Sequence, residues 1–179
     1  MEYHDTLNKL YARDDRLVRN FQESVFPAST FNLGPNTITL DHIDFANVAY
    51  GLCCISALGD YNPDNGGHMI LFDLSIIIRF PPGSTMLIPS SVLRHGNTPI
   101  ASHETRMSFT QYCTGGLFRW VRYGFQTQKD LLKEENGAAR KEAIDRVWAE
   151  RCNHGIGFFS KVSELADDRR KAFPGGRSL

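Results

Sequence analysis

The chain has 179 residues, enough for one domain with a sizeable hydrophobic core. Its 20 basic and 20 acidic residues cancel, so no global field directs it to a nucleic acid or a membrane, and a polyanion would need a local basic patch. The N-terminal stretch is charged, no apolar run is long enough to span a membrane, and the four cysteines lack metal-type spacing. We therefore expect an intracellular monomer without a signal peptide or a membrane anchor.

The apolar pattern predicts a helix, then a β-rich core, then further helices. Apolar side chains at helical spacing predict a helix over residues 5–22. Short apolar segments between Gly- and Pro-rich turns follow over about residues 29–125, which is typical of a sandwich or barrel. Residues 127–173 then have helical character, with an interruption near Gly137. We expect a single domain over residues 1–179, of the α+β class and mainly β.

Individual strands of this core can be placed between the turns. Residues 48–58 are nearly all apolar, as expected for a strand that is buried on both faces. Gly115 and Gly116 predict a hairpin turn before the last strand. The strands that we expect cover residues 30–33, 37–44, 48–58, 68–72, 74–80, 85–89, 106–113 and 117–123.

The predicted strand over residues 37–44 carries a candidate metal site. His42 and Asp44 are two residues apart, so on a strand their side chains point to the same face, among the apolar neighbours Leu40 and Ile43. A carboxylate in such surroundings is costly unless it is paired or binds a metal. His95 is the best candidate for a third ligand, and two histidines with one carboxylate form the facial triad that holds non-haem Fe(II). Because chance supplies many H-x-D sequences, this hypothesis depends on the rest of the chain.

A second pair of residues follows His95 in the sequence. Arg106 and Ser108 are two apart on one predicted strand and therefore share a face. Arginine offers a planar fork to a carboxylate, and the serine hydroxyl adds one donor. This pair suits the remote carboxylate of 2-oxoglutarate, whose keto-acid end would chelate the iron. The alternative interpretation is a surface salt-bridge arginine beside incidental histidines, which the order of the motifs makes less favoured.

These motifs together resemble the Fe(II)/2-oxoglutarate-dependent dioxygenases. The similarity is greater to one branch, the TET/JBP-like dioxygenases that are expanded in mushroom-forming fungi, and it covers most of the chain apart from its C-terminal part. The resemblance implies a double-stranded β-helix, the jelly roll that cupins also use, with flanking N- and C-terminal helices and the ligands at its open mouth. The segments that carry it are Phe31–Pro35, His42–Asn47, Gly66–His68, Phe80–Thr85, His95, Arg106–Tyr112 and Gly115–Trp120.

The resemblance also implies a function. It implies oxidation of the methyl group of 5-methylcytosine, and in some relatives of other methylated bases, in DNA or RNA. The reaction would use Fe(II) and 2-oxoglutarate as cofactors, consume the 2-oxoglutarate together with O2, and release succinate and CO2 as coproducts. The partner would be a nucleic acid with methylated bases, which implies a nuclear location. Such a base has to leave the stack and enter a pocket beside the iron.

Four further residues are candidates for contacts in the site, each with an alternative role. Asn47 lies three residues after Asp44, where its amide can read a Watson–Crick edge or simply hold the turn. Tyr112 can flank the base or belong to the core. His68 opens a strand near the predicted mouth and is a candidate for substrate contact rather than a metal ligand. Asn32 can touch the cosubstrate or merely end its strand.

Two other functions compete with methyl oxidation of a base. The same iron chemistry could act on a small molecule or a protein, which the neutral net charge favours mildly. A catalytically inactive nucleic-acid-binding relative is the other alternative, and the complete set of His42, Asp44, His95 and Arg106 argues against it. Phosphates would be met by a local patch of arginines, for which the candidates are Arg13, Arg16, Arg19, Arg94, Arg119 and Arg122.

Overall fold

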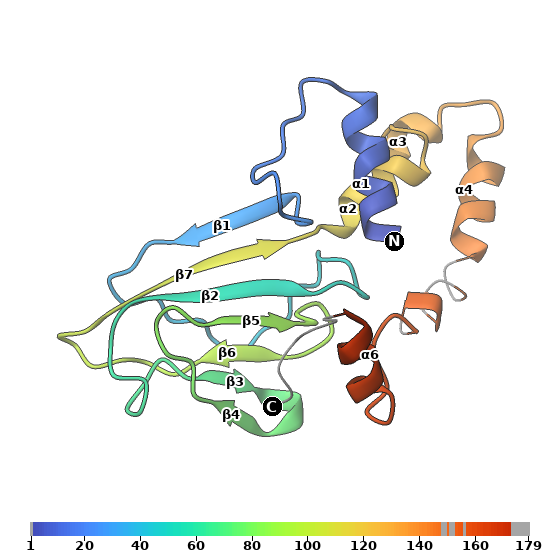
Figure 1. Cartoon of the computed structure of the whole chain (residues 1–179). Coiled ribbons are helices and arrows are strands. Elements are labelled where there is room, and N and C mark those ends of the chain that lie inside the picture. The colour runs from blue at the N-terminus through green and yellow to red at the C-terminus, as the bar shows by residue number, and fades with distance from the viewer. Residues whose placement is uncertain (1, 148–149, 151–152, 156, 173–179) are drawn as a thin grey trace.

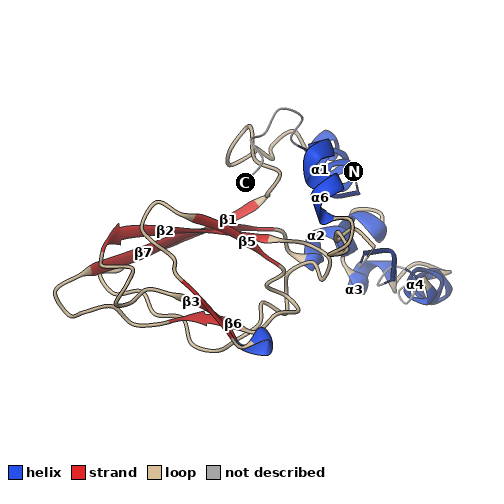
Figure 2. Ribbon diagram, turned by 60° about the horizontal axis from the view of Figure 1, so that its bottom comes forward, coloured by secondary structure: helices blue, strands red, loops and turns tan. Residues whose placement is uncertain are grey.

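Two antiparallel sheets form the centre of the computed structural model, which describes residues 2–147, 150, 153–155 and 157–172. One sheet has the strand order β1-β7-β2-β5 and the other has the order β4-β3-β6. Figure 2 shows them as two layers that face each other, with the helices gathered at one end. The strands are β1 (Ala28–Asn32), β2 (Cys53–Asp60), β3 (Met69–Leu71), β4 (Ile76–Ile78), β5 (Thr85–Ile88), β6 (His95–Asn97) and β7 (Thr105–Tyr112).

Residues 37–44 lie beside β6 and complete the smaller sheet as an irregular extended segment. His42 and His95 exchange two backbone hydrogen bonds, of 3.2 and 3.0 Å, in one antiparallel bridge. With this segment included, each sheet has four members, and apart from the hairpin of β3 and β4 the chain passes from one sheet to the other at each step, as it does in a jelly roll. The predicted double-stranded β-helix core with flanking helices is therefore confirmed.

The regular strand that we expected over residues 37–44 is, however, wrong. The backbone amides along this segment bond to different partners, so no continuous ladder forms. The Thr37 amide donates to the Arg106 carbonyl, the Thr39 amide to the side-chain oxygen of Asn97, and the Asp44 amide to the Ser90 carbonyl. Sequence periodicity reports which side chains share a face, and it does not report where the backbone bonds go.

The main hydrophobic core lies between the two sheets. Alternate residues of β2, namely Cys53, Ile55 and Ala57, point inward and pack with Met69 and Leu71 of β3 and with Phe80 and Ile88. The opposite face of β2 is not buried, and Leu58 is 41% exposed. The expectation of a strand over residues 48–58 with two buried faces is therefore wrong, because only one sheet face is covered here.

Helices from both ends of the chain lie beyond one end of the sheets (Figure 1). The first helix is shorter than the predicted span of residues 5–22, because it ends at Arg13. There the Asp14 carboxylate accepts hydrogen bonds from both the amide and the guanidinium of Arg16, which favours a turn over another helical turn. The helices are α1 (Glu2–Arg13), η1 (Phe72–Leu74, one 3₁₀ turn), α2 (Gly115–Arg122), α3 (Gln128–Leu131), α4 (Gly137–Arg146) and α6 (Leu165–Ala172).

The second helix replaces the strand that we expected over residues 117–123. The apolar residues Leu117, Phe118 and Val121 are spaced as on one helical face, and Phe118 is buried against Val48 and Cys113. The glycines at its start leave the sheet instead of forming a hairpin, because the Gly115 amide donates to the Ala46 carbonyl at 2.8 Å. Among the described residues, no helix has the length and apolar character needed to cross a membrane.

Candidate metal centre

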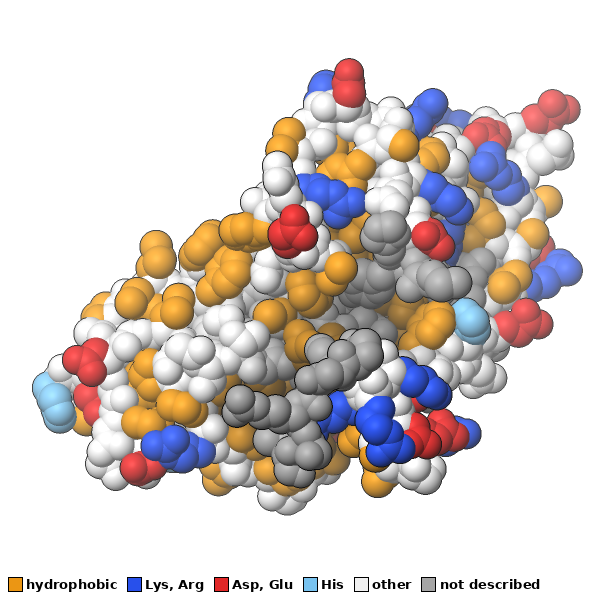
Figure 3. Space-filling view, viewed as in Figure 1, with side chains coloured by type: hydrophobic (Ala, Val, Ile, Leu, Met, Phe, Trp, Pro, Cys, Tyr) orange, Lys and Arg blue, Asp and Glu red, His pale blue; other side chains and the backbone are white. Residues whose placement is uncertain are grey.

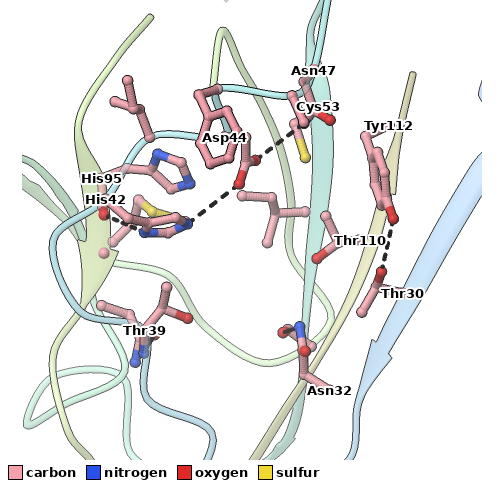
Figure 4. Close-up of a pocket in the computed structure, with 18 of the residues that line it drawn as sticks. Thr30, Asn32, Thr39, His42, Asp44, Asn47, Cys53, His95, Thr110 and Tyr112 are labelled. Atoms are coloured by element: carbon pink, nitrogen blue, oxygen red, sulfur yellow. Dashed lines mark hydrogen bonds and ion pairs between the residues drawn. The ribbon is translucent and has the colours of Figure 1, made fainter. Parts of the chain in front are cut away.

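Three predicted ligands meet at the mouth of the jelly roll. His42 and Asp44 come from the extended segment, and His95 comes from β6 across the backbone bridge. One ligand atom of each lies within 4.8 Å of those of the other two. Figure 4 shows the two imidazoles and the carboxylate turned toward a common space. The arrangement leaves one side open, as a facial set of two histidines and one carboxylate requires.

Hydrogen bonds set which nitrogen of each imidazole is available. Nδ1 of His42 lies 2.9 Å from the Leu40 carbonyl and 3.1 Å from the His95 carbonyl, and Nδ1 of His95 lies 2.9 Å from the Leu93 carbonyl. A carbonyl only accepts, so Nδ1 of each ring is the donor, and in the neutral imidazole Nε2 is then the nitrogen whose lone pair can bind a metal. Burial lowers the pKa of His95 below its ordinary value of 6.5, which favours this neutral form.

The carboxylate of Asp44 is oriented from two sides. Its Oδ1 lies 3.5 Å from Nε2 of His42, and its Oδ2 accepts a hydrogen bond of 3.2 Å from the side-chain amide of Asn47. The same amide lies 3.4 Å from Oγ of Ser90. Asn47 therefore makes its contact with the predicted metal ligand, while still lining the cavity. Both roles that the sequence left open for Asn47 are compatible with this position.

Arg106 is a buried cation without an anionic partner among the described residues. Its side chain is 2% exposed, and Nη1 donates to the Thr37 carbonyl at 3.1 Å, but Nε has no partner. Burial lowers the pKa of Arg106, while the nearby Tyr61 opposes that shift. An arginine in such a place lacks the paired acceptor that a buried charge normally requires. The guanidinium thus fits an anionic ligand inside the cavity.

The neighbours of Arg106 extend this anion site. Ser108 lies two residues further along β7 on the same face, and it is paired in register with Asn32 of β1. The side-chain amide of Asn32 donates to Oγ of Ser108 at 2.9 Å. All three residues line the same cavity as the metal cluster. The structure therefore brings together the six residues that the sequence proposed for metal and cosubstrate.

This cavity has a volume of about 610 Å³ and lies between the inner faces of β1, β7 and β2 and the segment that carries the H-x-D motif. Besides Asp44, Arg106 and the histidines, its lining is neutral. Burial, with a contribution from Asp44, raises the pKa of the Cys53 thiol in this lining to about 12, so the thiol stays uncharged. Figure 4 labels part of the lining. Residues that the sequence reasoning did not propose include Thr30, Thr39, Cys53, Ile55, Met69, Asn97 and Thr110.

Two of the substrate candidates have different outcomes. Tyr112 lines the cavity, and its hydroxyl lies 3.3 Å from that of Thr30 on the neighbouring strand. His68 is not among the lining residues, and its Nδ1 lies 3.1 Å from Oγ of Thr98. Met69 lines the cavity instead, because adjacent residues at the start of β3 point to opposite faces.

An ion pair outside the cavity holds the two histidine-bearing segments together. The guanidinium of Arg94 pairs with both carboxylate oxygens of Asp41, and its backbone amide donates to Asp73 at 2.7 Å. Asp41 precedes His42, and Arg94 precedes His95. The ion pair therefore stabilises the His42–His95 backbone bridge from outside the cavity, and the charge of Arg94 is balanced by Asp41.

Comparisons with known proteins assign no family. No protein-family model matches the sequence, and no curated protein matches it. Solved structures that are similar include NgTET1 in complex with 5mC DNA, with 16% identity and a TM-score of 0.47, over 64% of this chain and 48% of the other. A viral collagen prolyl hydroxylase from Paramecium bursaria Chlorella virus-1, in a 2OG complex, has 12% identity and a TM-score of 0.33, over 60% and 68% of the two chains.

An RmlC-like cupin protein from Desulfovibrio desulfuricans is similar at 16% identity and a TM-score of 0.32, over 53% of this chain and 94% of the other. This chain thus spans about half the length of NgTET1. Likenesses at these identities and scores assign no activity. The function of this chain has to be argued from its own residues.

Proposed function

We propose that the protein is an Fe(II)/2-oxoglutarate-dependent oxygenase. The observation that carries the proposal is one cavity that holds both a His42–Asp44–His95 cluster and the buried guanidinium of Arg106, which has no anionic partner among the described residues. A metal cluster by itself fits many hydrolases, and a buried arginine by itself fits many anion sites. A facial set beside a cationic anchor fits a metal together with an acidic chelating cosubstrate.

The chain's own residues have distinct tasks in this proposal. His42, Asp44 and His95 would hold the iron, and the Nδ1 hydrogen bonds and the Asn47 amide fix the direction of the ligands. Arg106 and its neighbours would hold the remote carboxylate of 2-oxoglutarate. Iron and 2-oxoglutarate, when bound, supply the coupling of O2 reduction and decarboxylation to substrate oxidation. The protein orients the substrate and excludes water from the buried half of the cavity.

For the substrate we propose the methyl group of a methylated base, with 5-methylcytosine first, in DNA or RNA. The neutral lining of the cavity supports this choice, because it offers hydroxyls and amides to a polar uncharged edge. The volume lies within the range of about 300–1,000 Å³ that is usual for small-molecule sites, which leaves space for a base beside the cosubstrate. Membership of the fungal TET/JBP-like branch, like a nuclear location, stays a proposal from the sequence resemblance.

The basic patch that we expected around the site is mostly occupied by internal contacts. Arg16 pairs with Asp14, and Arg94 pairs with Asp41. The guanidiniums of Arg13, Arg19 and Arg122 lie over aromatic rings. Figure 3 shows basic and acidic side chains interspersed on the face that it presents, without one continuous basic field. Contact with nucleic acid would therefore depend on few phosphates and on the base itself.

The test is to incubate the protein with Fe(II), 2-oxoglutarate and duplex DNA that carries 5-methylcytosine, and to measure both succinate and oxidised base by mass spectrometry. The proposal expects one succinate for each oxidation step found on the base with the parent, and neither product with Asp44→Ala. If succinate formed without base oxidation, and a small molecule or a protein were oxidised in matching amount, the oxygenase proposal would stand and the methylated base would be rejected as its substrate. Failure to bind Fe(II) and 2-oxoglutarate would reject both.

A further inference from the structure

A large aromatic side chain stands exposed at the rim of the cavity. Phe45 is 87% exposed and at the same time lines the cavity, and Ile43 beside it is 42% exposed and does the same. Both residues flank Asp44, so the rim lies next to the proposed metal. Exposed apolar side chains grouped at a cavity mouth mark a contact site more often than isolated surface residues do.

The backbone holds this aromatic in place. Residues 44–47 form a turn, which we call the Phe45 turn, closed by a 2.8 Å hydrogen bond from the Asn47 amide to the Asp44 carbonyl. Its first residue is tied to Ser90 at 2.9 Å, and its end is tied to the start of α2 through Gly115. Anchored at both ends, the turn keeps Phe45 directed away from the core. The backbone bonds therefore fix the position of the turn that presents the exposed ring.

A free cation adjoins the same turn. At the start of α2, a Cβ at Gly115 would lie 3.5 Å from the Ala46 carbonyl and 3.9 Å from Nη1 of Arg119. Arg119 is exposed and forms no ion pair with any residue that the structure describes. Arg119 thus lies next to Gly115, whose amide bonds to the carbonyl of Ala46, the residue that follows Phe45. An exposed aromatic ring on a turn with an exposed arginine close to that turn suits a base stack and its phosphates.

We propose that the Phe45 turn opens a nucleic-acid duplex: Phe45 enters the stack at the place that the methylated nucleotide leaves, and Arg119 contacts a neighbouring phosphate. This inference rests on the proposed function, and it names the duplex as the form of substrate that the site is built to open. Removing a base from a duplex costs unpairing and unstacking energy, which an inserted apolar side chain offsets. A single strand has no pairing to break and less stacking to lose, so we expect Phe45 to contribute much more on duplex than on a single strand.

The experiment compares the parent with Phe45→Ala on duplex and single-stranded oligonucleotides of one sequence. A 2-aminopurine next to the target reports local unstacking through its fluorescence, and this measurement needs no turnover. We expect Phe45→Ala to lose most of the fluorescence rise and at least about tenfold of the duplex oxidation rate, with less than about twofold loss on the single strand. Phe45→Trp, which keeps a large aromatic ring, should retain both the fluorescence rise and the duplex oxidation rate of the parent.

Two further variants keep the test sharp. Leu40→Ala removes a side chain on the same segment that is 78% exposed but does not line the cavity, and it should behave as the parent. Arg119→Gln should reduce the slope of log affinity against log salt by about 0.9, the value for one phosphate contact. A fluorescence rise in Phe45→Ala equal to that of the parent, or no binding of the parent to duplex, would overturn the proposal that Phe45 enters the stack. An intact fluorescence rise without base oxidation would instead reject the proposed chemistry.

Discussion

Replacing Arg106 with methionine should separate cosubstrate binding from folding. The change removes a buried charge and keeps a long apolar stem in a place that is 2% exposed. Breaking a buried charge pair by removing one partner costs about 3–5 kcal/mol. We therefore expect 2-oxoglutarate affinity to fall by roughly two to three and a half orders of magnitude, at about 1.4 kcal/mol for each factor of ten.

The fold itself should tolerate this substitution. The Thr37 carbonyl, which accepts from Nη1 of Arg106, also accepts from the side-chain amide of Asn97 at 3.3 Å, so it is not left without a donor. Substituting a buried charged group by an apolar one of similar volume is often neutral or stabilising. The melting temperature of Arg106→Met without ligand should therefore stay within a few degrees of the parent, or rise.

Calorimetric titration with 2-oxoglutarate in the presence of Mn²⁺, paired with thermal unfolding, measures both quantities. The parent should gain about 2.7 kcal/mol of stability at a ligand concentration of one hundred times Kd, and Arg106→Met should gain almost none at that concentration. Arg79→Met, which removes an exposed arginine paired with Asp64, is the matched control and should bind as the parent does. Parent-like affinity in Arg106→Met would refute the assignment of the anion site.

Three further predictions concern the metal centre. Asp44→Ala should weaken metal binding by more than about 100-fold in a competition titration with a chromophoric chelator, since it removes a ligand rather than a supporting group, and unchanged affinity would contradict the triad. Asn47→Ala should weaken metal binding about 10–100-fold, because its amide supports Asp44, while 2-oxoglutarate affinity through Arg106 is retained. Burial lowers the pKa of His95 in the folded state, so below the ordinary value of 6.5 the unfolded state binds more protons than the folded state. The free energy of unfolding of the chelator-treated protein should therefore fall as pH decreases from about 6.5 toward the lowered pKa. Denaturant titrations at several pH values measure this loss of stability, and His95→Gln should abolish it. If stability depended on pH in the same way in His95→Gln as in the parent, the explanation would be contradicted.

Alternation along the strands explains why the sequence predicted most of the site. Arg106 and Ser108 are spaced by two on β7, and the strand turns both into the cavity while Met107 between them is not a lining residue. His42 and Asp44 also reach the cavity, but on an irregular segment where Ile43 lines it too, so for this pair the spacing gave the right residues without a regular strand. The same reasoning, continued for two residues beyond His95, would have found Asn97. Cavity residues such as Thr30 and Thr39 carry no comparable signal, because hydroxyl residues are common on any strand.

Contacts between distant segments explain the errors. Residues 117–123 fit two patterns, because Phe118 and Trp120 alternate as on a strand while Leu117, Phe118 and Val121 share one helical face. In the structure Phe118 packs against Val48 and Cys113, so contacts with distant residues accompany the helical choice. His68 was expected near the substrate because it opens a strand at the mouth; its ring bonds to Thr98 outside the cavity lining, and its contact with a substrate stays a prediction. The pairing of β3 with β6 turns Met69 toward the cavity and therefore its neighbour His68 away from it.

The bridge between His42 and His95 has a consequence for the order in which the protein folds. These residues are 53 apart in sequence, and the length-dependent entropy of closing such a loop is about 3.5 kcal/mol. A metal held by the proposed site would meet His42 and Asp44 close together in the unfolded chain, whereas His95 would join them only once this loop has closed. Such a metal would stabilise the native state only by the difference between its affinities for the complete site and for the local pair. Chelation should accordingly speed unfolding and leave the refolding rate nearly unchanged.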